Sequence, residues 1–130
     1  MLLHPKIYKK ELKKMRKSGI ILSELIKKKG NRRMIKHIVF WRLKPEIDKI
    51  EAGKRIKEEL EGLKSKIEYL RFIQVGINFE ASDAAYDVAL VTEFDTREDL
   101  GRYQANPDHQ AAAEYVRFVA AERAVVDYEY

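Results

Sequence analysis

The side chains in this sequence with the clearest capacity for chemistry are two histidines, a tyrosine and the single tryptophan. His109 can exchange protons near neutral pH because the unperturbed pKa of an imidazole is roughly 6.5, which makes it the first candidate for a general acid or base. Tyr103 precedes it by six residues. A buried phenol needs a hydrogen-bond partner, and His109 would supply one. The two residues are therefore the candidate catalytic pair.

A second candidate group comes from alternation along the chain. His37, Val39 and Trp41 are spaced two residues apart, so in a β-strand they share one face. We predict that they point into the same interior of the fold, where Trp41 forms wall or core. Structural roles remain open for both histidines. His37 would then be a hydrogen-bonded core residue, and His109, close after Pro107, would bind backbone groups at a helix start.

The composition argues against several kinds of site. There is no cysteine, which rules out disulfides, thiolate metal sites and thiol nucleophiles. The two histidines after residue 33 do not have the spacing of a zinc motif, and no carboxylate cluster accompanies them. The sequence also lacks a glycine-rich phosphate loop and a GxSxG nucleophile elbow. We therefore expect no metal and no cofactor.

Charge divides the chain at Met34. Residues 1–33 hold twelve Lys and Arg against two Glu, a balance of +10, and residues 34–130 hold fourteen against nineteen acidic residues, a balance of −5. The larger part is acidic, so it gives no reason to expect a nucleic-acid partner. No apolar run approaches the roughly 18–20 residues of a membrane span. We expect a cytoplasmic protein with neither nucleic acid nor membrane as partner.

Three interpretations of the basic segment 1–33 are open. The start has been assigned too early, since Lys29 to Met34 can be encoded by an A/G-rich string resembling a bacterial ribosome-binding site. Alternatively the segment is a disordered, solvated tail, or a basic amphipathic arm for anionic lipid or nucleic acid. The first two interpretations are favoured, and a single domain is expected over residues 34–130.

Alternating and helical patterns predict the elements of the first half of this domain. A strand is expected from Ile35 to Leu43, with bulky side chains on both faces, and Pro45 then opens a helix. The apolar stripe of that helix is formed by Ile47, Ile50, Ile56, Leu60, Leu63 and Ile67. Two further strands are expected from Leu70 to Phe79 and from Tyr86 to Phe94.

The second half begins with a helix start at Thr96, which is followed by acidic residues. Pro107 must break or restart this helix because proline cannot continue it. Its second piece is expected from about Asp108 to Arg123, and a last strand from Ala124 to Tyr130.

The resulting order is β-α-β-β-α-β. It predicts an α+β, ferredoxin-like fold in which a four-stranded antiparallel sheet carries its helices on one face. The opposite face would present Ile38, Phe40 and Val91, which need cover. Two such sheets packed face to face make a dimeric α/β barrel, so we predict a homodimer formed through the open sheet face.

Four segments, in order, resemble the stress-responsive A/B barrel (Dabb) family. They are Met34-Ile-Lys-His37-Ile-Val-Phe-Trp41-Arg, Tyr86-Asp-Val-Ala-Leu-Val-Thr-Glu-Phe94, Leu100-Gly-Arg-Tyr103-Gln-Ala-Asn106-Pro107-Asp-His109 and Val126-Asp127-Tyr128-Glu129. The resemblance covers 34–130 and none of the basic segment. It implies a dimeric α+β barrel that takes part in stress responses, in a family whose bacterial members mostly have no assigned activity.

One plant branch of this family, the olivetolic acid cyclases, closes a linear polyketide by aldol chemistry without a cofactor. The resemblance maps its acid/base pair onto Tyr103 and His109, its first-strand histidine onto His37, and its apolar pocket positions onto Val39 and Trp41. Two departures are Asn106, where the plant sequences carry a His-Pro, and Trp41, which is bulkier than the aliphatic residue found there.

Three functions follow as hypotheses. The first is a homodimer of undetermined activity with a pocket for a small hydrophobic or aromatic ligand between sheet and helices. The second is a cofactor-independent cyclase-like or isomerase-like enzyme in which His109 takes a proton from an acidic C–H and Tyr103 donates to the developing enolate oxygen. A haem-degrading monooxygenase-like activity, known in the wider superfamily, is the third.

The hypotheses differ in the cavity they require. An enclosed cavity of roughly 300 Å3 or more, with His37, Tyr103 and His109 converging on it, would favour a ligand site. A volume filled by Trp41 and the first helix would contradict catalysis.

Overall fold

The computed structural model describes residues 9–10, 13 and 33–130 of the chain. The chain divides into two units, residues 1–33 and residues 34–130. The three interpretations of the basic segment concern residues that lie almost entirely outside the described ranges, so they stay predictions. None of the described helices combines the length and apolar character needed to cross a bilayer. The cytoplasmic location also stays a prediction.

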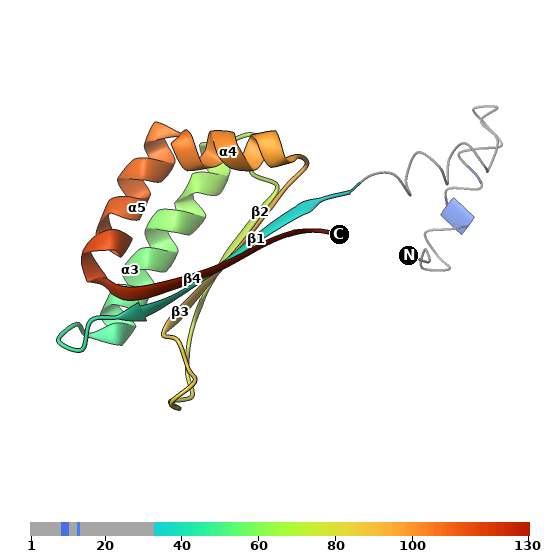
Figure 1. The fold of residues 1–130 in the computed structure, drawn as a ribbon. Helices are drawn as coiled ribbons and strands as arrows, with labels where there is room; N and C mark the ends of the chain where they lie inside the picture. The colour runs from blue at the N-terminus through green and yellow to red at the C-terminus, as the bar shows by residue number, and fades with distance from the viewer. Residues whose placement is uncertain (1–8, 11–12, 14–32) are drawn as a thin grey trace. The chain divides into compact units, whose positions relative to one another are not determined.

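Residues 34–130 fold into one antiparallel sheet with its helices on one side (Figure 1). The strands, in the spatial order β2-β3-β1-β4, are β1 (Ile35–Leu43), β2 (Phe72–Ile77), β3 (Val88–Phe94) and β4 (Ala120–Glu129). The helices are α3 (Lys49–Glu61), the 3₁₀ turn η1 (Gly62–Ser65), α4 (Arg97–Ala105) and α5 (Pro107–Val119). This is the predicted ferredoxin-like α+β fold.

Strand β1 lies inside the sheet, where it pairs with both β3 and β4. Its bounds match the prediction, and so does its alternation. His37, Val39, Trp41 and Leu43 are buried under the helices, whereas the intervening residues are partly or fully exposed on the outer face. In the register, His37 lies between Thr92 of β3 and Asp127 of β4.

Helix α3 begins later than predicted. Pro45 lies in a turn closed by the bond from the Ile47 N–H to the Lys44 carbonyl, 3.0 Å, and the helix starts at Lys49. The cap is Asp48, whose carboxylate accepts from the N–H groups of the second and third helical residues at 3.1 Å each. The Asp48 carboxylate accepts hydrogen bonds from N–H groups of the first turn that have no partner inside the helix. A proline at the helix start would only have removed one such N–H group.

The apolar stripe of α3 was also predicted partly wrongly. Ile50 is 54% exposed, and the small residues Ala52 and Gly53 face the sheet instead. A Cβ at Gly53 would lie 3.1 Å from the side chain of Ile77, so α3 approaches β2 more closely here than a large side chain at position 53 would allow. The remaining stripe residues that are fully buried are Ile56, Leu60, Leu63 and Ile67.

The predicted break in the second helix is confirmed. Asn106 has the extended backbone typical of a residue before proline, and its side chain accepts from the N–H groups of Asp108 at 2.8 Å and His109 at 3.4 Å. Pro107 is the first residue of α5, a position where a missing N–H costs nothing. The break places the end of α4, with Tyr103, beside the first turn of α5, with His109.

Helix α5 ends at Val119, not near Arg123, and β4 begins at Ala120 without a loop. The Lys44 N–H donates to the Val119 carbonyl at 2.9 Å, so the end of β1 captures the chain as it leaves the helix. As a result Arg123 belongs to the strand, where it lies opposite Trp41.

Candidate functional site

The predicted site residues meet at a cavity between the sheet and the helix layer, with a volume of about 240 Å3. The wall is formed by His37, Val39, Trp41, Leu60, Leu90, Gln104, His109, Ala113, Val116, Arg117 and Arg123. His37, Val39 and Trp41 all line it, as the alternation and the family resemblance together predict, and His109 joins them from α5. Tyr103 does not line the cavity, and the volume is below the roughly 300 Å3 set as the criterion. Trp41 forms part of the wall and leaves the space unfilled.

On the sheet side, His37 is held by contacts on both neighbouring strands. Its Nδ1 donates to a carboxylate oxygen of Asp127, its register partner on β4. The hydroxyl of the buried Thr92 donates to the His37 carbonyl at 3.3 Å. The carboxylate fixes the tautomer, so Nε2 is the acceptor of the neutral ring. Such an imidazole is pre-oriented for hydrogen bonding or proton transfer.

On the helix side, the rings of Tyr103 and His109 are in tilted contact and are not hydrogen-bonded to each other. Their ring centroids are 4.3 Å apart at an interplanar angle of 46°, and the fully buried Tyr103 ring also packs 5.0 Å from that of Phe94. Among the described residues, neither the Tyr103 hydroxyl nor His109 Nδ1 has a hydrogen-bond partner. The predicted Tyr103–His109 hydrogen bond is therefore wrong, because the two rings pack against each other at a tilt and leave the Tyr103 hydroxyl unpaired. Two buried polar atoms without partners are unusual in a native domain.

Burial also shifts the acid/base properties of this pair. It raises the pKa of the Tyr103 phenol well above its ordinary value, so the phenol stays protonated and keeps its O–H as a hydrogen-bond donor. The pKa of His109 lies below its ordinary value because burial outweighs a hydrogen bond to the Gln104 backbone, which acts in the opposite direction. The nearby His37, Arg117 and Arg123 lower this pKa further. His109 is therefore a neutral imidazole at pH 7.

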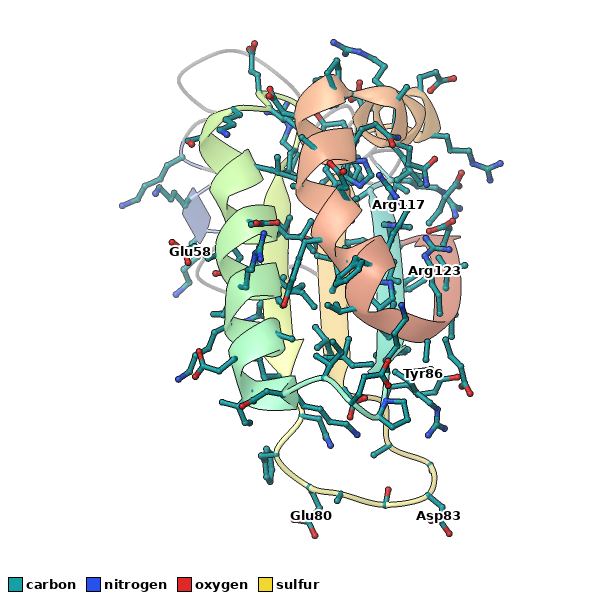
Figure 2. The ribbon with its side chains drawn as sticks, turned by 90° about the vertical axis from the view of Figure 1, so that its left-hand side faces the viewer. Glu58, Glu80, Asp83, Tyr86, Arg117 and Arg123 are labelled. Carbon is teal, nitrogen blue, oxygen red and sulfur yellow. The ribbon has the colours of Figure 1, made fainter. Side chains whose placement is uncertain are left out.

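Sequence reasoning missed three residues that shape the site. Asp127 orients His37, while Arg117 of α5 and Arg123 of β4 line the cavity. Figure 2 shows both arginines on the same edge of the molecule, beside α5 and the neighbouring strands. The available signal was alternation in β4, which puts residues 123, 125 and 127 on the face of their register partners Trp41, Val39 and His37.

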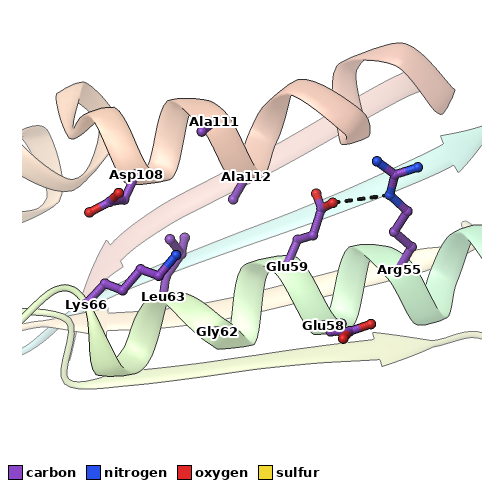
Figure 3. A pocket seen from close by; sticks show the side chains of 9 residues that line it. All are labelled: Arg55, Glu58, Glu59, Gly62, Leu63, Lys66, Asp108, Ala111 and Ala112. Carbon is purple, nitrogen blue, oxygen red and sulfur yellow. Dashed lines mark hydrogen bonds and ion pairs between the residues drawn. The ribbon is translucent and has the colours of Figure 1, made fainter.

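A larger hollow, of about 600 Å3, lies between α3 and α5 and lacks comparable chemistry (Figure 3). Its lining includes Arg55 and Glu59, which pair with each other at 3.1 Å, together with Leu63 and two alanines. No histidine or tyrosine of the described ranges lines it. Within the described part of the chain, no group of three or more metal-ligating side chains is found there or elsewhere.

The sequence of this domain matches a known family model. The model of the stress-responsive A/B barrel domain aligns with residues 35–130. The match begins one residue after Met34 and covers every strand and helix described above.

Individual relatives agree with this match. An uncharacterized protein of Streptomyces coelicolor is 33% identical over 101 residues, which is 75% of this chain and all of that protein. A dimeric, ferredoxin-like protein of unknown function from Bacteroides fragilis has a similar structure, with a TM-score of 0.69, 35% identity, and coverage of 75% of this chain and 96% of the other. Hydroxynitrile lyase from Passiflora edulis has a TM-score of 0.67 at 16% identity, with coverage of 76% and 94%. At this identity the lyase shows a shared fold alone.

Proposed function

Because this chain belongs to the stress-responsive A/B barrel family, we propose that it is a homodimer whose domains each hold a small hydrophobic or aromatic molecule between sheet and helices. The observation that carries the proposal is the cavity itself. Its walls are mainly apolar, and imidazoles enter it from both the sheet and the helix layer. A ligand pocket combines apolar walls with a few convergent polar groups in this way.

The size of the cavity selects for a small ligand. Its volume of about 240 Å3 lies just below the roughly 300–1,000 Å3 of typical ligand pockets. This supports a compact molecule over a macrocycle, so haem-degrading activity remains the weakest of the three hypotheses. A Soret shift on haem titration, lost in His37→Ala or His109→Ala, would reverse that order.

A homodimer is supported by the outer face of the sheet. This face is lined by apolar side chains that none of the helices within residues 34–130 covers: Ile38, Phe40, Phe72, Val91 and Val126. Burying such a face against a second copy removes apolar surface from water at about 25 cal/mol per Å2. The Bacteroides fragilis relative is itself dimeric.

Light scattering tests the dimer. We expect Val126→Glu, which puts a charge on the outer face, to yield a monomer. The matched control is Val125→Glu, one residue away on the opposite face of β4 and also exposed. If both variants keep the wild-type mass, the open face is not the interface.

A thermal-shift screen of small apolar and aromatic compounds tests the pocket. We expect compounds that raise the melting temperature of the wild type and have little effect on His109→Ala. Glu114→Gln, an exposed change on the same helix that does not line the cavity, is the control and should respond like wild type. Hits whose shift survives in His109→Ala would place their binding elsewhere.

Cofactor-independent acid/base catalysis is the alternative, and two observations favour it. His109 is neutral and next to a phenol that stays protonated, and His37, which lines the same cavity, is oriented by a carboxylate. An imidazole would take a proton from a carbon next to a carbonyl, while a hydroxyl or imidazole N–H stabilises the enolate oxygen. Tyr103 would have to turn toward the cavity to fill the second role.

This reaction class has a direct readout, the exchange of α-hydrogens of small diketones for deuterium in D2O, followed by NMR. We expect exchange faster than in buffer, reduced by about 10²-fold or more in His37→Ala and His109→Ala. Glu114→Gln again serves as control. Absence of any acceleration would contradict the catalytic alternative and leave the binding proposal standing.

A further inference from the structure

The charged side chains that line the cavity all have the same sign. They are Arg117, in the last turn of α5, and Arg123, on the inner face of β4 opposite Trp41. Among the residues that the structure describes, no acidic one lines the cavity. The other polar residues in the wall are His37, His109 and Gln104.

These two arginines differ from the others in the domain. Five of the seven arginines between Met34 and Tyr130 pair with a carboxylate, at 2.6 to 3.1 Å: Arg42, Arg55, Arg71, Arg97 and Arg102. Among the described residues, Arg117 and Arg123 have no carboxylate partner. The Arg117 guanidinium donates to the Gln110 carbonyl at 3.1 Å, which leaves most of its N–H groups available.

The field of both guanidiniums reaches into the cavity. Arg117 and Arg123 each contribute to lowering the pKa of His109. An anion placed between them would offset that contribution. It would also accept the planar, bidentate hydrogen bonds that a guanidinium makes best with a carboxylate.

We propose that the cavity binds a small carboxylic acid as its anion, with the carboxylate between Arg117 and Arg123 and the apolar body inside, against Trp41, Leu90 and Val116. This deepens the proposed function and rests on it, since it names the chemical class of the ligand for the same cavity. Apolar walls select the body, and the two arginines select the charge. A phosphate ester would use the same guanidiniums, but the small volume and the flat forks favour a carboxylate.

The test uses pairs of probes that differ only in charge. Benzoate and hexanoate, with their primary amides benzamide and hexanamide, are titrated into the full chain by calorimetry, together with phenyl phosphate. We expect at least one acid to bind about tenfold or more tightly than its amide. Arg117→Gln and Arg123→Gln should each remove most of that preference and leave amide binding unchanged.

The control is Arg97→Gln, which removes an arginine paired with Glu129 outside the cavity. It should keep the full preference. A second readout is the NMR titration of His109, whose pKa should rise when the acid is bound because the anion offsets the arginines. Neither readout depends on catalysis.

Each other outcome has a definite meaning. Equal binding of acid and amide, lost in His109→Ala, would overturn the anion inference and keep the pocket. Absence of binding by every probe would overturn both. Tighter binding of phenyl phosphate than of either acid would replace the carboxylate by a phosphate ester. If the Arg123→Gln variant is a monomer and binds the acid as wild type does, Arg123 belongs to the dimer interface. Its role in recognition would then be overturned.

Discussion

His37 and His109 face one cavity from opposite sides, His37 from the sheet and His109 from the helix layer. His37 lies in the central strand, donates to Asp127 and has its carbonyl bound by Thr92. His109 lies in the first turn of α5, where its Nδ1 and the hydroxyl of the neighbouring Tyr103 have no partner among the described residues. The sheet side is thus completed by protein groups, whereas the helix side leaves polar atoms unpaired.

The difference follows from how each side is built. Strand residues inherit their neighbours from a hydrogen-bonded register, so a carboxylate opposite a histidine is held at a set distance. The helix side depends on the junction between α4 and α5 at Asn106-Pro107. This junction brings the rings of Tyr103 and His109 into contact but does not pair the hydrogen-bond donors of one ring with acceptors of the other. We infer that His37 is pre-oriented, and that the helix side gains more from an incoming molecule.

The largest effect on stability is expected from Tyr103→Ala, which tests the helix side. It removes the fully buried ring against which His109 packs, and we expect the free energy of unfolding to fall by about 3–5 kcal/mol. Urea unfolding at fixed protein concentration measures the loss. A loss below about 1 kcal/mol would show that the helix side is loosely packed and that the stack is not structural.

Asp127→Ala tests the sheet side and has the next largest effect. It leaves the buried Nδ1 of His37 without an acceptor, which costs about 1–3 kcal/mol. Asp127→Asn keeps an acceptor and should recover part of this. Nitrogen-15 shifts of the His37 ring would report a changed tautomer in the alanine variant. An unchanged ring in Asp127→Ala would contradict its role as the orienting group.

A smaller effect is expected from pH. The pKa of His109 in the folded state lies below the roughly 6.5 of the unfolded chain, so the unfolded chain takes up the proton first as the pH falls. The free energy of unfolding should therefore decrease as the pH drops through about 6.5, and this loss should be absent above about pH 7.5. Denaturation of wild type and His109→Gln between pH 5.5 and 8 isolates the contribution as a difference. Parallel curves would contradict it.

The smallest effect is expected from Tyr103→Phe. The hydroxyl has no partner among the described residues, so its removal should leave stability unchanged or raise it by up to about 1 kcal/mol. Thermal unfolding is sufficient to measure this. A loss of more than about 1 kcal/mol would mean that the hydroxyl is hydrogen-bonded in solution. The helix side would then resemble the sheet side in having its polar groups paired.

Much of the fold was predictable because local patterns reflect it directly. The alternation from Ile35 to Leu43 specified a strand with one buried and one exposed face, and Thr96 and Pro107 marked two helix starts correctly. The errors arose where tertiary contacts overrode a local signal. Ile50 fits an apolar stripe but is exposed, and the contact of α3 with β2 is made by the small residue Gly53 instead. Arg123 reads as the end of a helix, yet the edge of β1 captures the chain from Ala120 onward.

The candidate site was predictable to a similar, limited degree. His37, Val39, Trp41 and His109 were identified from alternation, side-chain chemistry and family resemblance, and all four line one cavity. Tyr103 was expected in the cavity and lies behind His109 instead.

Local sequence patterns specify the element order, the buried face of β1, the break at Pro107 and the family resemblance, because each of these depends on residues that are close together in the chain. The tertiary structure alone decided which groups meet. Asp127 lies 90 positions from His37 and becomes its partner only through the β1–β4 register. Arg117 and Arg123 line the same cavity only because α5 ends at Val119 and β4 begins at Ala120. Contacts of this kind depend on pairing across the sheet, which no local pattern records.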